Sequence, residues 1–160
     1  MGNKIKDYIY LIFVSLVLFI AGAIIIGGIK YFIGISIGID FVSIIIYYLL
    51  SAFLTRQILK YIRIRNTFVS IYLPLLTGIM YILSQYVAFI IIYTVMGYPF
   101  IEVLKVIPEV MVMQVLSYFT SFSLSVDGIF GPIINILILL IEILVMVIGI
   151  YQSYKVTRRE

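Results

Sequence analysis

The stretch that decides the fold runs from Tyr8 to Ile29 and reads YIYLIFVSLVLFIAGAIIIGGI. It contains no charged residue, and at about 1.5 Å of rise per residue a helix of this length crosses a hydrocarbon layer of roughly 30 Å. Its Ala21-Gly22-Ala23 step resembles a signal-peptidase site, but the isoleucines that follow are too apolar for the residues around a cleavage point. We therefore expect this run to stay in the protein as a membrane span.

The composition of the whole chain agrees with that expectation. Of the 160 residues, 64% are hydrophobic and 11% are charged, whereas a soluble domain is about half apolar and about a quarter charged. Cysteine and histidine are absent, which excludes disulfides, thiolate nucleophiles and zinc sites of the Cys/His type. The sequence also contains no phosphate-binding loop and no nucleophile elbow. We expect no enzymatic activity, no metal and no cofactor.

Three more apolar runs complete the predicted fold, an all-α integral membrane protein built as one domain over residues 1–160. The second run is the shortest and reaches the usual 20 or so residues only when its flanks are included. The third run contains Pro74 and Gly78, which membrane helices tolerate because neighbouring groups satisfy the freed backbone. The expected spans are about 8–30, 38–57, 67–96 and 129–151.

The segment between the third and fourth runs carries charges at helical spacing. Glu102, Lys105 and Glu109 share one face of a helix, and apolar residues occupy the rest. This pattern is typical of an amphipathic helix that lies in the membrane interface. We expect one interfacial helix at about 100–107 and, after Pro108, a second at 108–122. One alternative is that 108–122 dips into the membrane as a re-entrant segment. The other is that the whole segment is a fifth span, which would place the two termini on opposite sides.

The basic residues are distributed unevenly between the two sides of a four-span protein. Nine lie on the side of the termini and two on the other side, which is a positive-inside pattern. We therefore predict a plasma (inner) membrane protein with both termini in the cytoplasm. Short basic loops of this kind contact anionic lipid headgroups rather than nucleic acid. The headgroup residues are Arg56, Lys60, Arg63, Arg65, Lys155, Arg158 and Arg159, joined on that side by Lys4 and Lys6 and opposed by Lys30 and Lys105.

Glu142 is the most informative polar residue, because it lies near the middle of the last apolar run. A charge at that depth costs about 2.5 to 3.5 kcal/mol, so we expect the side chain to face the bundle interior. Asn135 shares its face, and Gln85, with Tyr81 or Tyr47, is the expected partner. The simpler interpretation is a structural hydrogen-bond clasp. The alternative is a proton, cation or substrate site in a small transporter or channel component.

Small residues mark the surfaces on which the helices pack, because they let membrane helices approach closely. These residues suggest a protein that works by packing, either as an accessory subunit or as a homo-oligomer, with lipids or another membrane protein as partners. The predicted packing positions are Gly22, Gly78, Gly131 and Gly149.

The layout resembles a group of small four-span bacterial membrane proteins that are themselves uncharacterised, some of which carry a zinc-ribbon or B-box-like part ahead of the membrane. The features in common are the glycine-bearing first hairpin (Ala21 to Gly38), a second span that ends at Arg56, and a last span that continues into a basic tail (Tyr151 to Arg159). The chain has no cysteine, so the zinc-binding part is absent. The resemblance implies the four-span topology and no mechanism.

Overall fold

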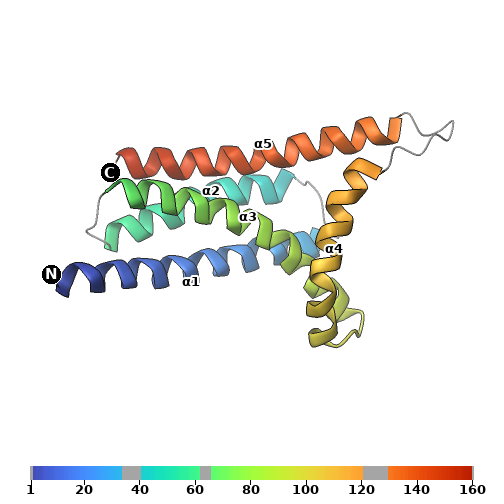
Figure 1. The fold of residues 1–160 in the computed structure, drawn as a ribbon, viewed down its shortest axis with the longest axis horizontal. Helices are drawn as coiled ribbons and strands as arrows, with labels where there is room; N and C mark the ends of the chain where they lie inside the picture. The colour runs from blue at the N-terminus through green and yellow to red at the C-terminus, as the bar shows by residue number, and fades with distance from the viewer. Residues whose placement is uncertain (1, 34–40, 62–65, 121–129, 160) are drawn as a thin grey trace.

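A computed structural model describes residues 2–33, 41–61, 66–120 and 130–159, and all the secondary structure in these residues is helical. Four of its five helices contain stretches long and apolar enough to cross a membrane, and α4 is not among them. The predicted all-α fold with four spanning helices is therefore confirmed. In chain order the helices are α1 (Gly2–Ile33), α2 (Phe41–Tyr61), α3 (Thr67–Val95), α4 (Phe100–Thr120) and α5 (Phe130–Arg159) (Figure 1).

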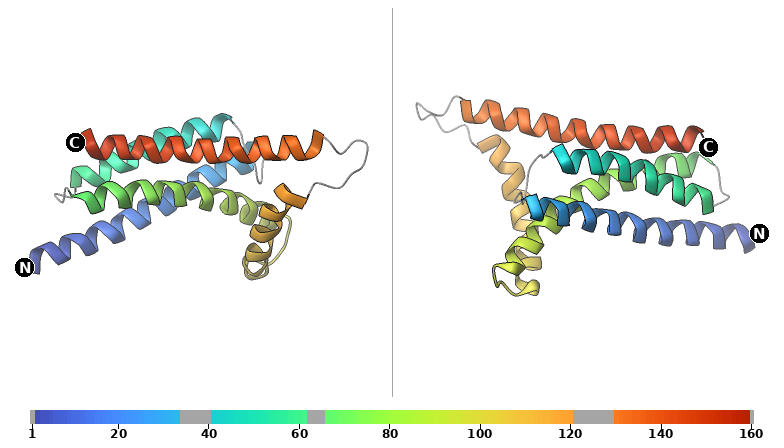
Figure 2. Two further views of the ribbon diagram at one scale, coloured as in Figure 1. Left: turned by 45° about the horizontal axis from the view of Figure 1, so that its top comes forward. Right: turned by 180° about the vertical axis from the view of Figure 1, so that it is seen from behind.

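The four apolar helices lie lengthwise beside one another, and α4 crosses the end of the bundle away from the termini (Figures 1 and 2). Both termini lie at the opposite end, together with the end of α2 and the start of α3. We call these two ends the α4 end and the terminal end. The arrangement agrees with an even number of spans, since each pass reverses the direction of the chain.

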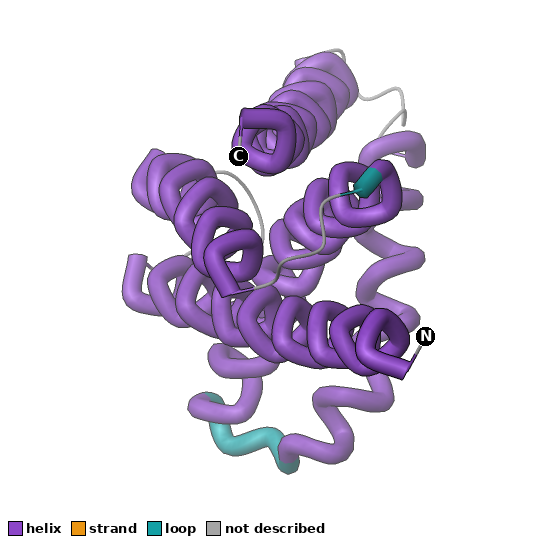
Figure 3. Tube along the Cα trace, turned by 90° about the vertical axis from the view of Figure 1, so that its left-hand side faces the viewer, coloured by secondary structure: helices purple, strands orange, loops and turns teal. Residues whose placement is uncertain are grey.

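The helices do not pack in the order of the sequence. α1 packs chiefly on α3, and α5 packs on α3 and α2. Seen from the terminal end, α1 and α5 lie on opposite sides with α2 and α3 between them (Figure 3). α3 is therefore the central helix, and it is also the most buried of the four.

The core follows helical periodicity. On α1 the buried positions are Leu11, Ser15, Phe19, Ala23 and Ile26, at steps of three and four, so they form one stripe toward α3. The other faces of the bundle expose isoleucine, leucine and phenylalanine in large numbers. An exposed apolar surface on all sides is what a bundle surrounded by lipid requires.

Local signals explain how α3 begins and ends. Asn66 caps its start, where the side-chain Oδ1 accepts a hydrogen bond from the Val69 backbone N–H at 3.1 Å. After its end, Gly97 has φ +96°, a conformation that glycine adopts without strain. The chain thereby reverses within a few residues and enters α4 directly.

α4 differs from the sequence prediction, because it is one helix where we expected a break at Pro108. Pro108 lies inside it. A proline inside a helix removes the hydrogen bond that its own N–H would donate, here to the carbonyl of Leu104, and its ring crowds that carbonyl, which kinks or weakens a helix without always ending it. Both Leu104 and Pro108 are exposed. Glu102, Lys105 and Glu109 are exposed as expected, whereas Val103 is buried.

Candidate functional site

The deepest charged group of the described chain is Lys30, which continues the buried stripe of α1. Its side chain is only 1% exposed. The Nζ atom donates a hydrogen bond to Oε1 of Gln85 on α3 at 2.7 Å and lies 5.9 Å from the ring centroid of Tyr81. The sequence pattern led us to treat Lys30 as the residue that closes the first apolar run. Its position four residues after Ile26 and seven after Ala23 was the signal that it faces inward.

Tyr47 joins three helices at mid-bundle. It is 1% exposed, and its hydroxyl donates to the carbonyl oxygen of Thr77 on α3 (3.2 Å) while also reaching the carbonyl oxygen of Met146 on α5 (3.3 Å). Its ring packs against that of Tyr81, with centroids 5.0 Å apart. Tyr47 and Tyr81, both predicted from the sequence, therefore occupy one polar cluster with Lys30 and Gln85.

Glu142 lies on α5 at the same level of the bundle. Its side chain is partly buried and interacts electrostatically with the hydroxyl of Tyr86 on α3. The predicted contact between Glu142 and Gln85 stays a prediction, since the described hydrogen bond of Gln85 joins it to Lys30. Asn135 is part of α5, but its side chain lies outside the described part of the structure.

Glycines make the close helix contacts around this cluster possible. A Cβ atom on Gly149 would lie 2.2 Å from Cε1 of Tyr47, so the tyrosine occupies the space that glycine leaves. A Cβ on Gly22 would lie 2.6 Å from Sδ of Met80, and one on Gly78 would lie 3.1 Å from Cδ1 of Ile150. Gly131 is in α5, outside the residues whose surroundings are described.

A close approach of two helix backbones involves a glycine that we did not predict. A Cβ on Gly27 would lie 2.6 Å from Cγ1 of Val87 and 2.9 Å from the backbone oxygen of Ser84, so α1 and α3 touch there almost backbone to backbone. The adjacent Gly28 has nothing within 4 Å of such an atom. The pair Gly27-Gly28 thus places one glycine in the interface and one outside it. The positions of the two glycines on the helix explain this difference, because Gly27 lies one turn after the buried Ala23 and therefore on the same face.

Toward the terminal end, the hydrogen bonds between helices join neutral side chains. Thr55 and Ser153 are 2.8 Å apart across α2 and α5, and Ser15 donates to the hydroxyl of Tyr72 at 3.1 Å across α1 and α3. The charged side chains at this end lie at the surface of the bundle instead. The described basic side chains there are all exposed: Lys6, Arg56, Lys60, Lys155 and Arg158.

Some of the predicted headgroup residues lie outside the part of the chain that the structure describes. These are Arg63 and Arg65, together with the side chain of Arg159. No group of three or more acidic, histidine or cysteine residues that could hold a metal ion occurs among the described residues.

Comparison with protein families, with curated proteins and with solved structures finds no match to this chain. The resemblance to small four-span bacterial membrane proteins therefore stays a prediction. We therefore infer the possible functions from the polar cluster of Lys30, Gln85, Tyr47 and Tyr81, together with Glu142. A buried ammonium, an amide, two tyrosine rings and a carboxylate on a neighbouring helix can hold a proton or a small ion, or they can hold four helices together.

Proposed function

We propose that this chain is a non-enzymatic subunit of a bacterial plasma membrane assembly, which acts by packing its helices against a membrane partner. The observation that carries the proposal is the way the core uses its polar groups. The Tyr47 hydroxyl is directed at the backbone carbonyls of two other helices. Hydroxyl pairs and the bond from Lys30 to Gln85 similarly join one helix to another. Groups engaged in this way favour a rigid scaffold.

The surface for such a partner is best sought on α5. Of the four apolar helices, α5 is the one least covered by its own chain. Its outer face presents Leu137, Leu140, Leu144 and Tyr151 to the surroundings. A partner would cover this face at little cost, since lipid and leucine are equally apolar and packing then decides the contact.

Site-specific photocrosslinking in cells tests the proposal. We expect benzoylphenylalanine in place of Leu144 to give a protein adduct, whose mass distinguishes a second copy of the chain from another protein. The matched control is Phe13 on α1, which is 68% exposed where Leu144 is 57% exposed, on the opposite side of the bundle. Adducts with lipid alone at both positions would contradict the proposal.

The orientation that we propose has both termini in the cytoplasm. Five exposed basic side chains are described at the terminal end, whereas at the α4 end the exposed charges are Lys105, Glu102 and Glu109. This distribution follows the positive-inside rule. The basic side chains at the terminal end would then contact anionic headgroups of the inner leaflet.

A second function, a small transporter or channel component, is favoured by one specific observation. Lys30 places a cation in the bundle interior, hydrogen-bonded to Gln85 of α3, and Glu142 lies partly buried on α5, which packs on α3 as well. Ionisable residues inside a membrane domain are costly and commonly mark ion or substrate pathways. In that function Glu142 or Lys30 would carry a proton or hold a substrate ion, so the ionisable form would be essential. The Glu142 variants in the Discussion separate the two functions.

A further inference from the structure

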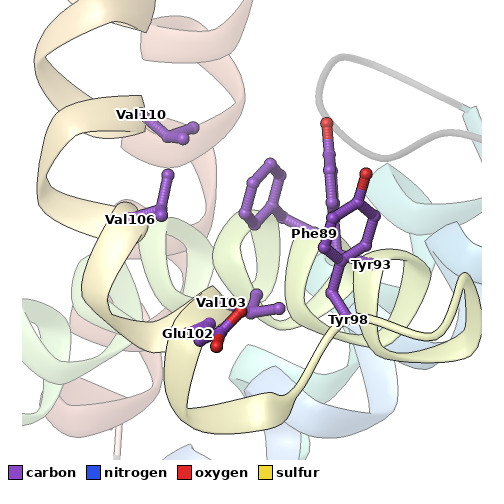
Figure 4. Close-up of a pocket in the computed structure, with 7 residues that line it drawn as sticks. All are labelled: Phe89, Tyr93, Tyr98, Glu102, Val103, Val106 and Val110. Carbon is purple, nitrogen blue, oxygen red and sulfur yellow. The ribbon is translucent and has the colours of Figure 1, made fainter.

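A pocket lies where the end of α3 meets the start of α4. It has a volume of about 370 Å³, within the roughly 300–1,000 Å³ typical of sites for small molecules. Figure 4 shows aromatic rings from α3 and the following turn on one side and valines of α4 on the other. The described lining residues are Phe89, Tyr93, Tyr98, Glu102, Val103, Val106 and Val110.

Backbone hydrogen bonds fix the turn that borders this pocket. The N–H of Gly97 donates to the carbonyl of Thr94 and that of Tyr98 to the carbonyl of Tyr93, both at 3.1 Å. The first turn of α4 is fixed in the same way, because the N–H of Glu102 donates to the carbonyl of Pro99 at 2.9 Å. The two tyrosines and the glutamate are therefore positioned by the turn itself, before any ligand binds.

The aromatic side of the pocket forms a continuous row. The ring centroids of Phe89 and Tyr93 are 4.3 Å apart, and those of Tyr93 and Tyr98 are 5.6 Å apart. Aromatic faces attract cations whose charge is spread over apolar groups, such as substituted ammonium ions. Glu102 is the one charged side chain among the described lining residues, and its charge is negative.

The composition of the lining excludes other classes of ligand. An anion would be repelled by Glu102, and a divalent metal ion needs several oxygen ligands where this pocket offers one carboxylate. A neutral sugar or nucleoside needs more hydrogen-bonding groups than two tyrosine hydroxyls. A cation with an apolar body satisfies both the aromatic and valine walls and the carboxylate. The pocket also lies where the apolar helices meet the exposed charges of α4, which is the depth at which amphiphilic cations concentrate.

We propose that this pocket binds a lipophilic organic cation, a quaternary or protonated amine that carries an apolar group. The ammonium lies against the rings of Tyr93 and Tyr98 with Glu102 as its counter-ion, and the apolar group lies against Val103, Val106 and Phe89. The cation is either free in solution or part of a lipid headgroup.

The absence of tryptophan from the chain gives a direct assay. In a Tyr98→Trp variant the single tryptophan reports on the pocket while an aromatic ring is kept. The protein is held in a neutral maltoside detergent and titrated with benzyltrimethylammonium. We expect a saturable change in tryptophan fluorescence. Neopentylbenzene, the uncharged carbon isostere of the same shape, should bind at least about fivefold more weakly.

Two variants in this background locate the binding energy. Glu102→Gln should weaken binding about fivefold, as expected for the loss of one partly exposed ion pair. Glu109→Gln is the matched control, because Glu109 is an exposed glutamate of the same helix that does not line the pocket. It should leave the affinity unchanged, and both variants should elute from size exclusion like the parent.

Competition identifies the source of the cation. Displacement by short-chain phosphatidylcholine and not by short-chain phosphatidylglycerol would assign the site to a lipid headgroup, and no displacement by either would assign it to a free organic cation. Three results would overturn the proposal: a fluorescence change that does not saturate, equal binding of neopentylbenzene, or equal weakening by Glu102→Gln and Glu109→Gln.

Discussion

The two ends of the bundle use polarity in opposite ways. At the terminal end the buried hydrogen bonds join neutral groups, such as Thr55 with Ser153, while the basic residues are exposed. Toward the α4 end a lysine of α1 is withdrawn into the core, and a carboxylate of α5 lies partly buried. The described basic side chains of the terminal end are therefore exposed, whereas one lysine side chain toward the α4 end is buried. We therefore expect any ligand binding or proton or ion transfer by this protein to take place toward the α4 end.

The largest expected effect concerns which side of the membrane each end faces. The chain has no cysteine, so single cysteines report accessibility without background. In intact cells an impermeant maleimide should label Glu109→Cys at the α4 end and leave Lys155→Cys at the terminal end unlabelled until the cells are opened. The reverse pattern would invert the topology, and labelling of both positions in intact cells would contradict the four-span arrangement.

The next effect compares a charged hydrogen bond with a neutral one. Gln85→Leu removes the described acceptor of Lys30, and hydrogen bonds to charged groups are worth about 1.5–3 kcal/mol. Thr55→Val removes a neutral bond, for which about 0.6 kcal/mol is the average inside membrane proteins. Titration with SDS measures both free energies of unfolding. Gln85→Glu keeps an acceptor and should restore stability, whereas equal losses for Gln85→Leu and Thr55→Val would erase the difference between the two ends.

A pair of adjacent glycines tests whether the α4 end is also the more tightly packed. Gly27→Ala forces a methyl group against Val87 and the Ser84 backbone, and overpacking of this kind costs about 1–3 kcal/mol. Gly28→Ala meets open space and should change stability little, so the two variants differ in contact and not in helix propensity. Thermal unfolding in detergent, followed by loss of the monodisperse elution peak, gives the comparison. Similar values for both would mean that α1 and α3 are further apart than described.

The smallest effect is the one that distinguishes the two functions. If Glu142 is structural, Glu142→Gln should be nearly neutral for stability because the amide keeps its hydrogen-bonding capacity, and Glu142→Leu should cost about 0.6–2 kcal/mol. If it is a transport site, Glu142→Gln should leave folding intact and abolish proton- or cation-dependent flux in liposomes. A Glu142→Gln variant with unchanged stability, association, photocrosslinking and flux supports the packing function, whereas a stable variant that has lost flux supports transport.

Hydropathy was sufficient to predict the number of spanning helices, because the bilayer requires about 20 apolar residues for each. The exposure of Glu102, Lys105 and Glu109 on α4 followed from their helical spacing, and the interfacial placement of this helix stays a prediction. The continuity of α4 through Pro108 could not be predicted in this way, since a proline can either kink a helix or end it. The sequence identified Pro108 as a residue that can break a helix, but it did not show what surrounds this residue.

Within the candidate site, the sequence indicated faces but not partners. The spacing of Tyr81 and Gln85 predicted a shared inward face on α3, and both are buried. The partner of Gln85 depends on which helix lies opposite, and the chain order 1–2–3 gave no reason to place α1 against α3. Lys30 was missed for the same reason, because a lysine at the end of an apolar run is normally read as a topology signal.

The two residues of the Lys30–Gln85 hydrogen bond are synthesised at different times. They are 55 positions apart, and a ribosome that adds about 5–20 residues per second takes roughly 3–11 s to make the second after the first. During that interval the first helix carries a cation whose acceptor has not been synthesised, and the flexible lysine stem lets the ammonium reach the headgroups. Arrival of the third helix then draws the charge from the water boundary into the protein. Assembly of this bundle therefore includes an inward movement of charge, and burial of the Lys30 ammonium is conditional on the third helix.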